Sequence, residues 1–246
     1  MIKDKTVLIT GANRGIGLAI VDKFLKNECN IIACSRKEDE VSLNELNKIR
    51  KKFPNKIKIY NFDQSKTNDV ENACNKILEE NKQIDVLINN AGQNHVALFL
   101  MTKIQKFKEI FEVNFFSHLT ITQKIIKNMM KNKCGSIINI ASNAAWEADI
   151  GRSAYATSKA SMITFTKILA KELGSYGIRV NSISPGLTNT SMMSEGISEK
   201  VMSETISKIP LKRVAQPEEI ANTCLFLASD LASYVSGENI SVTGGY

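Results

Sequence analysis

The feature that most constrains the fold is a regular alternation of short apolar runs with longer segments of helical periodicity. The apolar runs, each bounded by turn residues, predict strands at Thr6–Thr10, Asn30–Ser35, Ile57–Phe62, Val86–Asn89, Ser136–Ala141, Arg179–Ser184 and Asn239–Val242. The segments between them predict helices over Ile16–Asn27, Glu40–Phe53, Thr67–Asn81, Ile104–Asn132, Ala154–Tyr176 and Pro217–Ser229. Because the strands look buried on both faces, this alternation predicts an α/β fold, a doubly wound parallel sheet of about seven strands with helices on both faces. No repeat or low-complexity linker divides the chain, so we expect residues 1–246 to form a single domain.

One segment, Leu187–Arg213, breaks this rhythm. It is polar, rich in Met and Ser, and follows Pro185-Gly186. Such a segment is either a surface excursion with a short helix or a mobile lid over a pocket. We favour a substrate lid at about 187–213.

Charge and histidine content narrow the range of functions. The 32 basic and 25 acidic residues give a net charge of +7, which favours acidic partners but is not gathered into one tail or block. This charge is weak evidence for nucleic-acid binding, and we expect no nucleic-acid partner. Only His95 and His118 are available, which leaves almost no material for a histidine-rich metal site or a Ser/His/Asp triad. We therefore expect no metal, and we interpret both histidines as structural.

Cysteine usage and hydropathy predict the compartment. The five cysteines are odd in number, scattered and never spaced as CxxC, and they stand at positions 29, 34, 74, 134 and 224. This pattern suggests neither a disulfide framework nor a zinc site, so we expect a reducing, cytoplasmic location. No run approaches the roughly 18 apolar residues of a membrane span, and no signal-peptide core precedes the first strand.

The first predicted strand runs directly into a glycine-rich turn and then into an amphipathic helix. The turn reads Thr10-Gly11-Ala12-Asn13-Arg14-Gly15-Ile16-Gly17. Glycines in this context let the backbone approach a pyrophosphate at a helix N-terminus. The spacing, Gly-x3-Gly-x-Gly, is specific only in this strand–turn–helix context. We predict a dinucleotide site formed by Gly11, Asn13, Arg14, Gly15, Ile16 and Gly17.

The end of the second predicted strand predicts which dinucleotide binds. An acidic residue here would hold free ribose hydroxyls, but the sequence reads Cys34-Ser35-Arg36. Arg36, together with Arg14 from the glycine turn, can pair with a 2′-phosphate, so we predict NADP (NADPH) rather than NAD. Ser35 is included in this site. Asp63, after the third strand, either contacts the adenine amino group or caps the next helix.

Two further motifs carry chemistry. Asn89-Asn90-Ala91-Gly92 follows the fourth strand, where small residues let the chain pass beside a bound nucleotide. Tyr155 and Lys159 are spaced i, i+4 and share one helix face, and Ser142 stands thirteen residues before Tyr155 at the end of a strand.

Together these motifs resemble the short-chain dehydrogenase/reductase family, in its classical branch, over essentially the whole chain. The family's asparagine corresponds to Asn114 in FEVNFFSHL, its serine to Ser142 in IINIASNAA, and its Tyr-x3-Lys pair to Tyr155 and Lys159. The resemblance implies that Asn114, Ser142, Tyr155 and Lys159 are catalytic. It also implies that Asn90, Ala91, Gly92, Tyr155, Lys159, Pro185, Gly186 and Thr188 contact the cofactor, Thr188 at the nicotinamide carboxamide.

The implied chemistry is the reduction of a carbonyl. Tyr155 would donate the proton, Ser142 would hold the developing oxyanion, and Asn114 would anchor a water for proton relay. Lowering a phenol pKa of about 10 by three units requires roughly 4 kcal/mol. One cation about 4 Å away, at an effective dielectric near 20, supplies about 4 kcal/mol. Lys159 is therefore expected to lower the pKa of Tyr155 and to hold the nicotinamide ribose.

Within the family, the NSISPG and SGENISVTGG segments resemble the 3-oxoacyl-acyl-carrier-protein reductase type, an enzyme of fatty acid biosynthesis. An acidic carrier protein suits the net charge, and Lys131 and Lys133 stand where carrier-binding members present positive charge. Tyr176, however, stands where those members often have arginine. The segment Gln93–Leu98, which should line the substrate side, also lacks the Thr-Arg-Asp-like run that is common in that subgroup. Another ketone, secondary alcohol or sugar therefore remains an alternative substrate, and a nucleotide-sensing or nucleic-acid-binding module is the non-enzymatic alternative.

The resemblance also implies an oligomer. The long helices 104–132 and 154–176 carry more apolar residues than one sheet face needs, and in the family the equivalent helices pair subunits. The tail 242–246 would join a second interface. We expect a homotetramer, with a dimer or simply a thicker core within one subunit as alternatives.

Overall fold

A computed structural model of the chain describes residues 2–36, 40–194 and 199–246, and within these residues seven parallel strands form one sheet. The strands pair in the spatial order β3-β2-β1-β4-β5-β6-β7. They are β1 (Thr6–Thr10), β2 (Asn30–Ser35), β3 (Ile57–Asn61), β4 (Val86–Asn89), β5 (Gly135–Ile140), β6 (Ile178–Pro185) and β7 (Asn239–Val242). The predicted fold class is confirmed, and the predicted strand bounds agree with these to within one residue.

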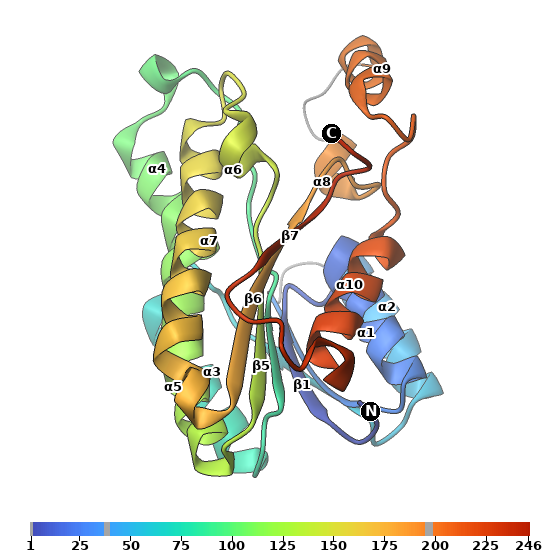
Figure 1. Ribbon diagram of the computed structural model, residues 1–246, viewed down its shortest axis with the longest axis vertical. Coiled ribbons are helices and arrows are strands. Elements are labelled where there is room, and N and C mark those ends of the chain that lie inside the picture. The colour runs from blue at the N-terminus through green and yellow to red at the C-terminus, as the bar shows by residue number, and fades with distance from the viewer. Residues whose placement is uncertain (1, 37–39, 195–198) are drawn as a thin grey trace.

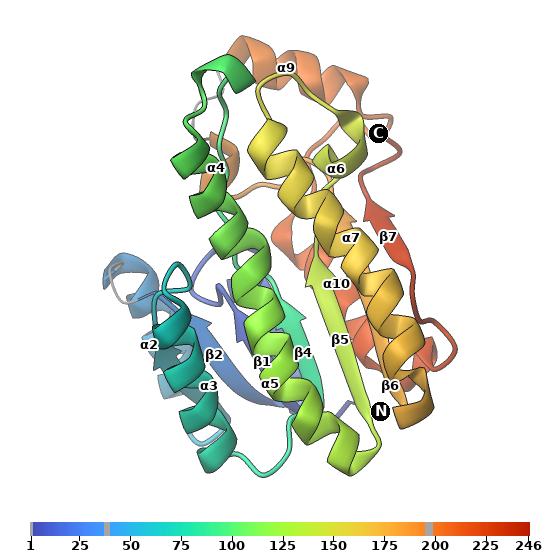
Figure 2. The same ribbon diagram turned by 90° about the vertical axis from the view of Figure 1, so that its left-hand side faces the viewer.

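Helices cover both faces of the sheet (Figure 1). On one face lie α1 (Gly15–Lys26), α2 (Glu40–Lys52) and α10 (Pro217–Ala228). On the other face lie α3 (Thr67–Glu80), α5 (Ser117–Asn132) and α7 (Ser153–Leu173), which stand in front of the sheet in Figure 2. Each face of the sheet therefore has its own hydrophobic core.

The two cores follow from the alternation of side chains along a strand. In β1, Val7 and Ile9 belong to the core beneath α1 and α10, whereas Leu8 between them belongs to the core beneath α3, α5 and α7. In β2, Ile31 and Ile32 divide in the same way. Burying one such side chain contributes about 1.5–3 kcal/mol, so strands that are apolar at every position are stable only between two helical layers.

The helix predicted over Ile104–Asn132 is not a single regular α-helix. It begins as α4 (Ile104–Phe111), passes through a π-helical turn, η2 (Glu112–Phe116), and continues as α5. A π-turn inserts an extra residue into the helical repeat, which hydrophobic periodicity does not reveal. Asn114, predicted as catalytic, lies inside this turn.

The segment predicted as a lid lies beyond the carboxyl end of the sheet, above β6 and β7 in Figure 1. It contains two helices, α8 (Ser191–Ser194) and α9 (Glu199–Lys208), where the sequence predicted one at most. Residues 195–198 of the predicted lid lie outside the described residues. A further short helix, α6 (Ala144–Glu147), follows β5 and was not predicted.

The described residues include no helix that is long and apolar enough to cross a membrane, and no group of three potential metal ligands from His, Cys, Asp and Glu. All five cysteines carry free thiols, and every one except Cys134 is buried. Burial raises the pKa of the Cys74 thiol to about 12, with Glu71 raising it further and Lys124 opposing. This thiol is therefore protonated and unreactive at neutral pH.

We predict that Phe24→Ala destabilises the protein much more than Phe226→Ala. Phe24 in α1 is fully buried, whereas Phe226 in α10 is 37% exposed. Removing the buried ring should lower the free energy of unfolding by about 3–5 kcal/mol, and removing the exposed ring by less than about 1 kcal/mol. Urea denaturation followed by circular dichroism measures both values, and similar losses would contradict the described packing of α1.

Candidate active site

A single large cleft of about 1010 Å³ opens at the carboxyl ends of β1, β2, β4, β5 and β6. Every residue that the sequence predicts for cofactor binding lines it, from Gly11 in the first turn to Thr188 after β6. Three of the four predicted catalytic residues, Ser142, Tyr155 and Lys159, line it as well. Residues as far apart along the chain as Gly11 and Thr188 therefore meet at one edge of the sheet, where ligands bind in open parallel folds.

The glycine turn is shaped so that only glycine fits at its three glycine positions. Gly11 and Gly15 have φ values of +61° and +52°, in the left-handed region. Gly17 has an ordinary φ, but a Cβ there would lie 2.0 Å from the Gly11 carbonyl oxygen and 2.7 Å from Nδ2 of Asn90. The first turn of α1 therefore packs directly against the loop that precedes it, and Gly15, Ile16 and Gly17 line the cleft.

Thr10 and Asn90 hold the turns after β1 and β4 together. The Thr10 hydroxyl accepts hydrogen bonds from the backbone N–H groups of Asn90 (2.9 Å) and Ala91 (3.0 Å). Nδ2 of Asn90 donates in return to the carbonyls of Thr10 (2.9 Å) and Gly11 (3.1 Å). Asn90 thus supports the glycine turn, a role that the sequence did not indicate, and Thr10 was not predicted as part of the site.

Arg36, directly after β2, and Arg14, in the glycine turn, are the residues predicted to select NADP over NAD. Arg14 and Arg36 both line the cleft, and Nη1 of Arg14 also donates to the Ser191 hydroxyl at 3.1 Å, which joins the glycine turn to α8. Asp63 accepts hydrogen bonds from the backbone N–H and hydroxyl of Ser65. Burial alone would raise the pKa of Asp63, but the bonds from Ser65 and the charges of Lys66 and Arg36 lower it. Asp63 therefore closes the turn before α3 but does not cap the helix itself, whose N-cap residue is Lys66 and has no side-chain capping bond; Asp63 still lines the cleft.

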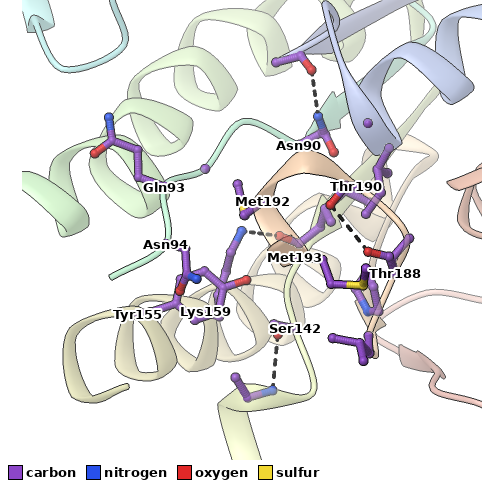
Figure 3. A pocket seen from close by; sticks show the side chains of 18 of the residues that line it. Asn90, Gln93, Asn94, Ser142, Tyr155, Lys159, Thr188, Thr190, Met192 and Met193 are labelled. Carbon is purple, nitrogen blue, oxygen red and sulfur yellow. Dashed lines mark hydrogen bonds between the residues drawn. The ribbon is translucent and has the colours of Figure 1, made fainter. Parts of the chain in front are cut away.

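Ser142, Tyr155 and Lys159 gather at the centre of the cleft (Figure 3). Ser142, at the end of β5, hydrogen-bonds the Tyr155 phenol and accepts from the backbone N–H of Ala144 at 3.2 Å. One turn along α7, Lys159 is 3% exposed, and its Nζ donates to the Ile140 carbonyl at 2.8 Å. The strand end and one helix face thus bring together the three groups that the sequence predicts.

The pKa of Tyr155 differs from the sequence-based expectation. Burial raises it above the ordinary phenol value, and the hydrogen bond from Ser142 and the charge of Arg152 offset this only in part. Burial likewise lowers the pKa of Lys159, to about 8. Desolvation of the phenolate outweighs the neighbouring cation, and Lys159 is not among the groups that lower the phenol pKa.

Asn114 lies behind the wall of the cleft rather than in it. It is fully buried, and its Nδ2 donates to the Gln93 carbonyl (3.0 Å) and the Ser158 hydroxyl (3.0 Å). Its Oδ1 accepts from the Gln93 backbone N–H at 2.7 Å. The π-turn thus aims Asn114 at the segment after Gly92 and ties that segment to α7.

Thr188 lines the cleft, whereas His118 is buried and contacts the turn after β4. The Thr188 hydroxyl donates to the Gly186 carbonyl at 2.9 Å, and Thr188 forms a parallel bridge with Ala215. Nε2 of His118 lies 2.8 Å from the Ala91 carbonyl and donates to it. Burial, together with the charge of Lys159, lowers the pKa of His118 to about 4 despite that bond, so the ring is neutral near pH 7. Its geometry supports the structural interpretation of this histidine.

Several lining residues were not assigned from the sequence. They lie on the substrate side and include Asp149, Ile150, Arg152, Met192, Met193, Met202 and Tyr246. No periodicity or motif marks them, because they come from loops and from the predicted lid. The i, i+3 spacing of Arg152 and Tyr155 was the one signal that could have identified Arg152.

Lys131 and Lys133, predicted to contact a carrier protein, lie far from this cleft. They end α5 and immediately precede the amino end of β5, whereas the cleft opens at the carboxyl ends of the strands. Figure 2 shows this end of α5 at the bottom of the molecule and α9 at the top. Both lysines are exposed.

Comparisons with known proteins agree with this geometry. A family model described as enoyl-(acyl carrier protein) reductase matches residues 11–246. The 3-oxoacyl-[acyl-carrier-protein] reductase FabG of Thermotoga maritima is 36% identical over 244 residues, which cover 99% of this chain and 98% of the relative. A 3alpha-hydroxysteroid dehydrogenase of Mediterraneibacter gnavus is 36% identical over 245 residues, covering 99% of this chain and 97% of the relative.

A solved structure extends the likeness to the cofactor. It is described as an NAD(P)-dependent gluconate 5-dehydrogenase of Beutenbergia cavernae with NADP bound at low occupancy. Its TM-score to this chain is 0.94 at 27% sequence identity, with coverage of 99% of this chain and 97% of that chain.

We predict that Gly17→Ala weakens NADPH binding, whereas Gly174→Ala leaves it unchanged. The new methyl group at position 17 would force the glycine turn to shift, but nothing lies within 4 Å of a Cβ at position 174. Overpacking of about 1–3 kcal/mol corresponds to about tenfold or more in affinity. Isothermal titration calorimetry with NADPH measures both variants. Equal affinities would show that the close approach at Gly17 has no part in binding.

Proposed function

The chain belongs to the short-chain dehydrogenase/reductase family, and from this premise we propose that it reduces 3-oxoacyl thioesters, carried by an acyl carrier protein, to the 3-hydroxyacyl form with NADPH. The observation that carries the proposal is the Ser142–Tyr155–Lys159 group at the centre of a cleft large enough for a dinucleotide and a substrate. The FabG relative, 36% identical over nearly the whole of both chains, supports the choice of substrate.

The residues of the cleft fit NADP. The glycine turn and the N-terminus of α1 would hold the pyrophosphate, because Gly17 leaves room for close approach of the backbone. Arg14 and Arg36 would pair with the 2′-phosphate, with Ser35 beside them. Asn90, Ala91, Gly92, Pro185, Gly186 and Thr188 would surround the nicotinamide half.

NADPH, when bound, supplies the hydride for the ketone carbon. Ser142 donates a hydrogen bond to the ketone oxygen, which stabilises the negative charge that develops there. Tyr155 delivers the proton to that oxygen. Its raised pKa keeps the phenol protonated at neutral pH, the state that a proton donor requires. Lys159, with a pKa of about 8, is largely a cation near pH 7 and would hold the nicotinamide ribose.

Asn114 acts as a positioning residue in this proposal. Its bonds to Gln93 and Ser158 fix the segment after Gly92 against the helix that carries Tyr155 and Lys159. The expected proton-relay water of Asn114 would have to compete with these three hydrogen bonds.

For partners, we propose an acidic carrier protein and a homotetramer, with no nucleic acid and no membrane. The net charge of +7 supports an acidic partner. Exposed apolar side chains near α4, such as Leu100 (96% exposed) and Met101 (74% exposed), support subunit contacts there. Because Lys131 and Lys133 lie at the edge opposite the cleft, they could serve only a carrier seated on a neighbouring subunit. The free thiols support a reducing, cytoplasmic location.

One observation favours a second candidate, the oxidation or reduction of an apolar cyclic alcohol or ketone. The hydroxysteroid dehydrogenase relative is as similar to this chain as the FabG relative. In addition, Met192, Met193 and Met202 line the substrate side of the cleft, and flexible thioethers adapt to apolar substrates of varied shape.

We predict that Tyr155→Phe abolishes most reduction of acetoacetyl thioesters, while Tyr234→Phe, at a fully exposed position, has no effect. Loss of the proton donor should lower kcat by about 10²- to 10⁴-fold without weakening NADPH binding. Steady-state assays with acetoacetyl-carrier protein, a 3-oxosteroid and a keto sugar acid would also compare the candidate substrates. Unchanged turnover in Tyr155→Phe would refute the catalytic assignment, and a kcat/KM higher for the steroid or sugar would favour the alternative.

We also predict that Ser142→Ala moves the pH profile of the reverse reaction to higher pH. Oxidation of an alcohol needs the Tyr155 phenolate to accept a proton, so kcat/KM should rise with pH through the pKa of Tyr155. The hydrogen bond from Ser142 lowers that pKa, and its loss should therefore shift the rise upward as well as slow the reaction. The profile of 3-hydroxybutyryl thioester oxidation, measured by initial rates from about pH 8 to about pH 11.5, extends past the ordinary phenol pKa of about 10 and tests this. A shift to lower pH would reverse the assigned direction of the hydrogen bond.

A further inference from the structure

Arg152 stands one helical turn before Tyr155 at the substrate side of the cleft. Arg152, Tyr155 and Lys159 follow the spacing i, i+3, i+7, which places all three on one face of the helix that begins at Ser153. All three line the cleft. Tyr155 therefore stands between Arg152 and Lys159 along this helix face, and the charge of Arg152 acts on its phenol.

The contacts of Arg152 leave most of its donors unused. Nη1 donates to Oδ1 of Asn94 at 3.5 Å, and Nε lies 3.9 Å from Oδ2 of Asp149. Within residues 2–36, 40–194 and 199–246, these are its two side-chain polar contacts, and both are long. A guanidinium carries five N–H donors in a planar fork, so this one retains the capacity to bind an oxygen acceptor bidentately. The side chain is 23% exposed, which holds it at the wall of the cleft rather than in open solvent.

Arg152 is poorly placed to stabilise its own helix. It occupies the N-cap position, where its side chain makes no capping hydrogen bond. A cation at this end opposes the helix dipole, which disfavours positive charge at an N-terminus. Its partner Asp149 is 56% exposed, so their ion pair is weak as well.

The positions of Arg152, Tyr155 and Lys159 along one helix face indicate which part of a bound substrate lies near Arg152. Ser142 and Tyr155 fix the position of the reacting ketone oxygen, and Lys159 lies on the cofactor side of it. Arg152 lies on the opposite side, next to Asn94, Asp149 and Ile150, where the rest of the substrate must extend. The first oxygen that a 3-oxoacyl substrate presents beyond its reacting ketone is the acyl oxygen at C1.

We propose that Arg152 binds the C1 acyl oxygen of the substrate and thereby selects 3-oxoacyl compounds over simple ketones. The inference rests on the proposed function and names the substrate feature that the same site recognises. The C1 oxygen comes either from a thioester carbonyl or from the carboxylate of a free 3-oxo acid, and the guanidinium can bind both. The same cation lowers the pKa of Tyr155, so its charge acts on the phenol from the substrate side.

The test compares three methyl ketones that differ in the group at the position of C1. Acetoacetate carries a carboxylate there, its N-acetylcysteamine thioester a neutral carbonyl, and 2-pentanone no oxygen. Hydrogen bonds to a charged group are worth about 1.5–3 kcal/mol, so Arg152→Gln should lower kcat/KM by about tenfold or more for a substrate that Arg152 binds. The value for 2-pentanone should fall less than about threefold.

Matched variants separate this role from structural effects. Arg152→Lys keeps the charge and should recover part of the lost kcat/KM, whereas Arg50→Gln, on the exposed side of α2, should have no effect. A loss for acetoacetate alone identifies the carboxylate as the recognised group, and a loss for the thioester identifies the thioester carbonyl. An equal loss for all three substrates, or no loss for either C1-bearing substrate, overturns the proposal.

A binding measurement decides the question independently of turnover. NADP⁺ has no hydride to give to acetoacetate or its thioester, so each forms a non-reacting complex with the NADP⁺-loaded protein. Calorimetry should show about tenfold or more weaker binding to Arg152→Gln than to the unaltered chain. Equal affinity, or no binding of either compound to the unaltered chain, overturns the proposal. If the unaltered chain binds them but reduces none with NADPH, the proposed function fails while the role of Arg152 stands.

Discussion

The pairing order of the strands determines where chemistry can take place in this protein. After β1 the chain proceeds toward β2 on one side, and after β4 it proceeds toward β5 on the other, so the loops leaving these two neighbouring strands diverge. A crevice must open where they part. The mutual hydrogen bonds of Thr10 and Asn90 close the base of this crevice, and the close approach of Gly17 to Gly11 shapes its wall. The residues of both turns at that junction, from Gly11 to Gly17 and from Asn90 to Gly92, line the cleft beside Ser142, Tyr155 and Lys159.

Within the crevice, desolvation competes with charge. Lys159 is almost fully buried and Tyr155 partly buried, and this desolvation disfavours the ammonium and the phenolate alike. The Ile140 carbonyl and the Ser142 hydroxyl offset part of this penalty for Lys159 and Tyr155 respectively. Tyr155 in such a site stays protonated until a substrate reacts, and it is suited to donate that proton when negative charge develops on a bound oxygen.

The two ends of the sheet carry different functions. The cleft, α8 and α9 lie at the carboxyl ends of the strands, and the exposed lysines at the end of α5 lie at the amino ends. Lys131 and Lys133 at the amino edge are separated by the length of the strands from the cleft of the same chain. The proposed oligomer is therefore part of the proposed function, because it alone could bring the amino edge of one subunit near the cleft of another.

The sequence by itself determined the sheet, its helices and most of the cleft, because these follow from local signals. Side-chain alternation defines strands, the spacing of three glycines defines a turn that no other residue fits, and Tyr155 and Lys159 share a helix face at any i, i+4 spacing. Only the tertiary structure decided that Asn114 lies behind the cleft wall, within a π-turn, and that burial sets the pKa of Tyr155. It alone also placed Arg152 at the substrate wall. Hydrogen-bond partners and desolvation arise between segments far apart in the chain, and no local pattern of residues records which segments meet.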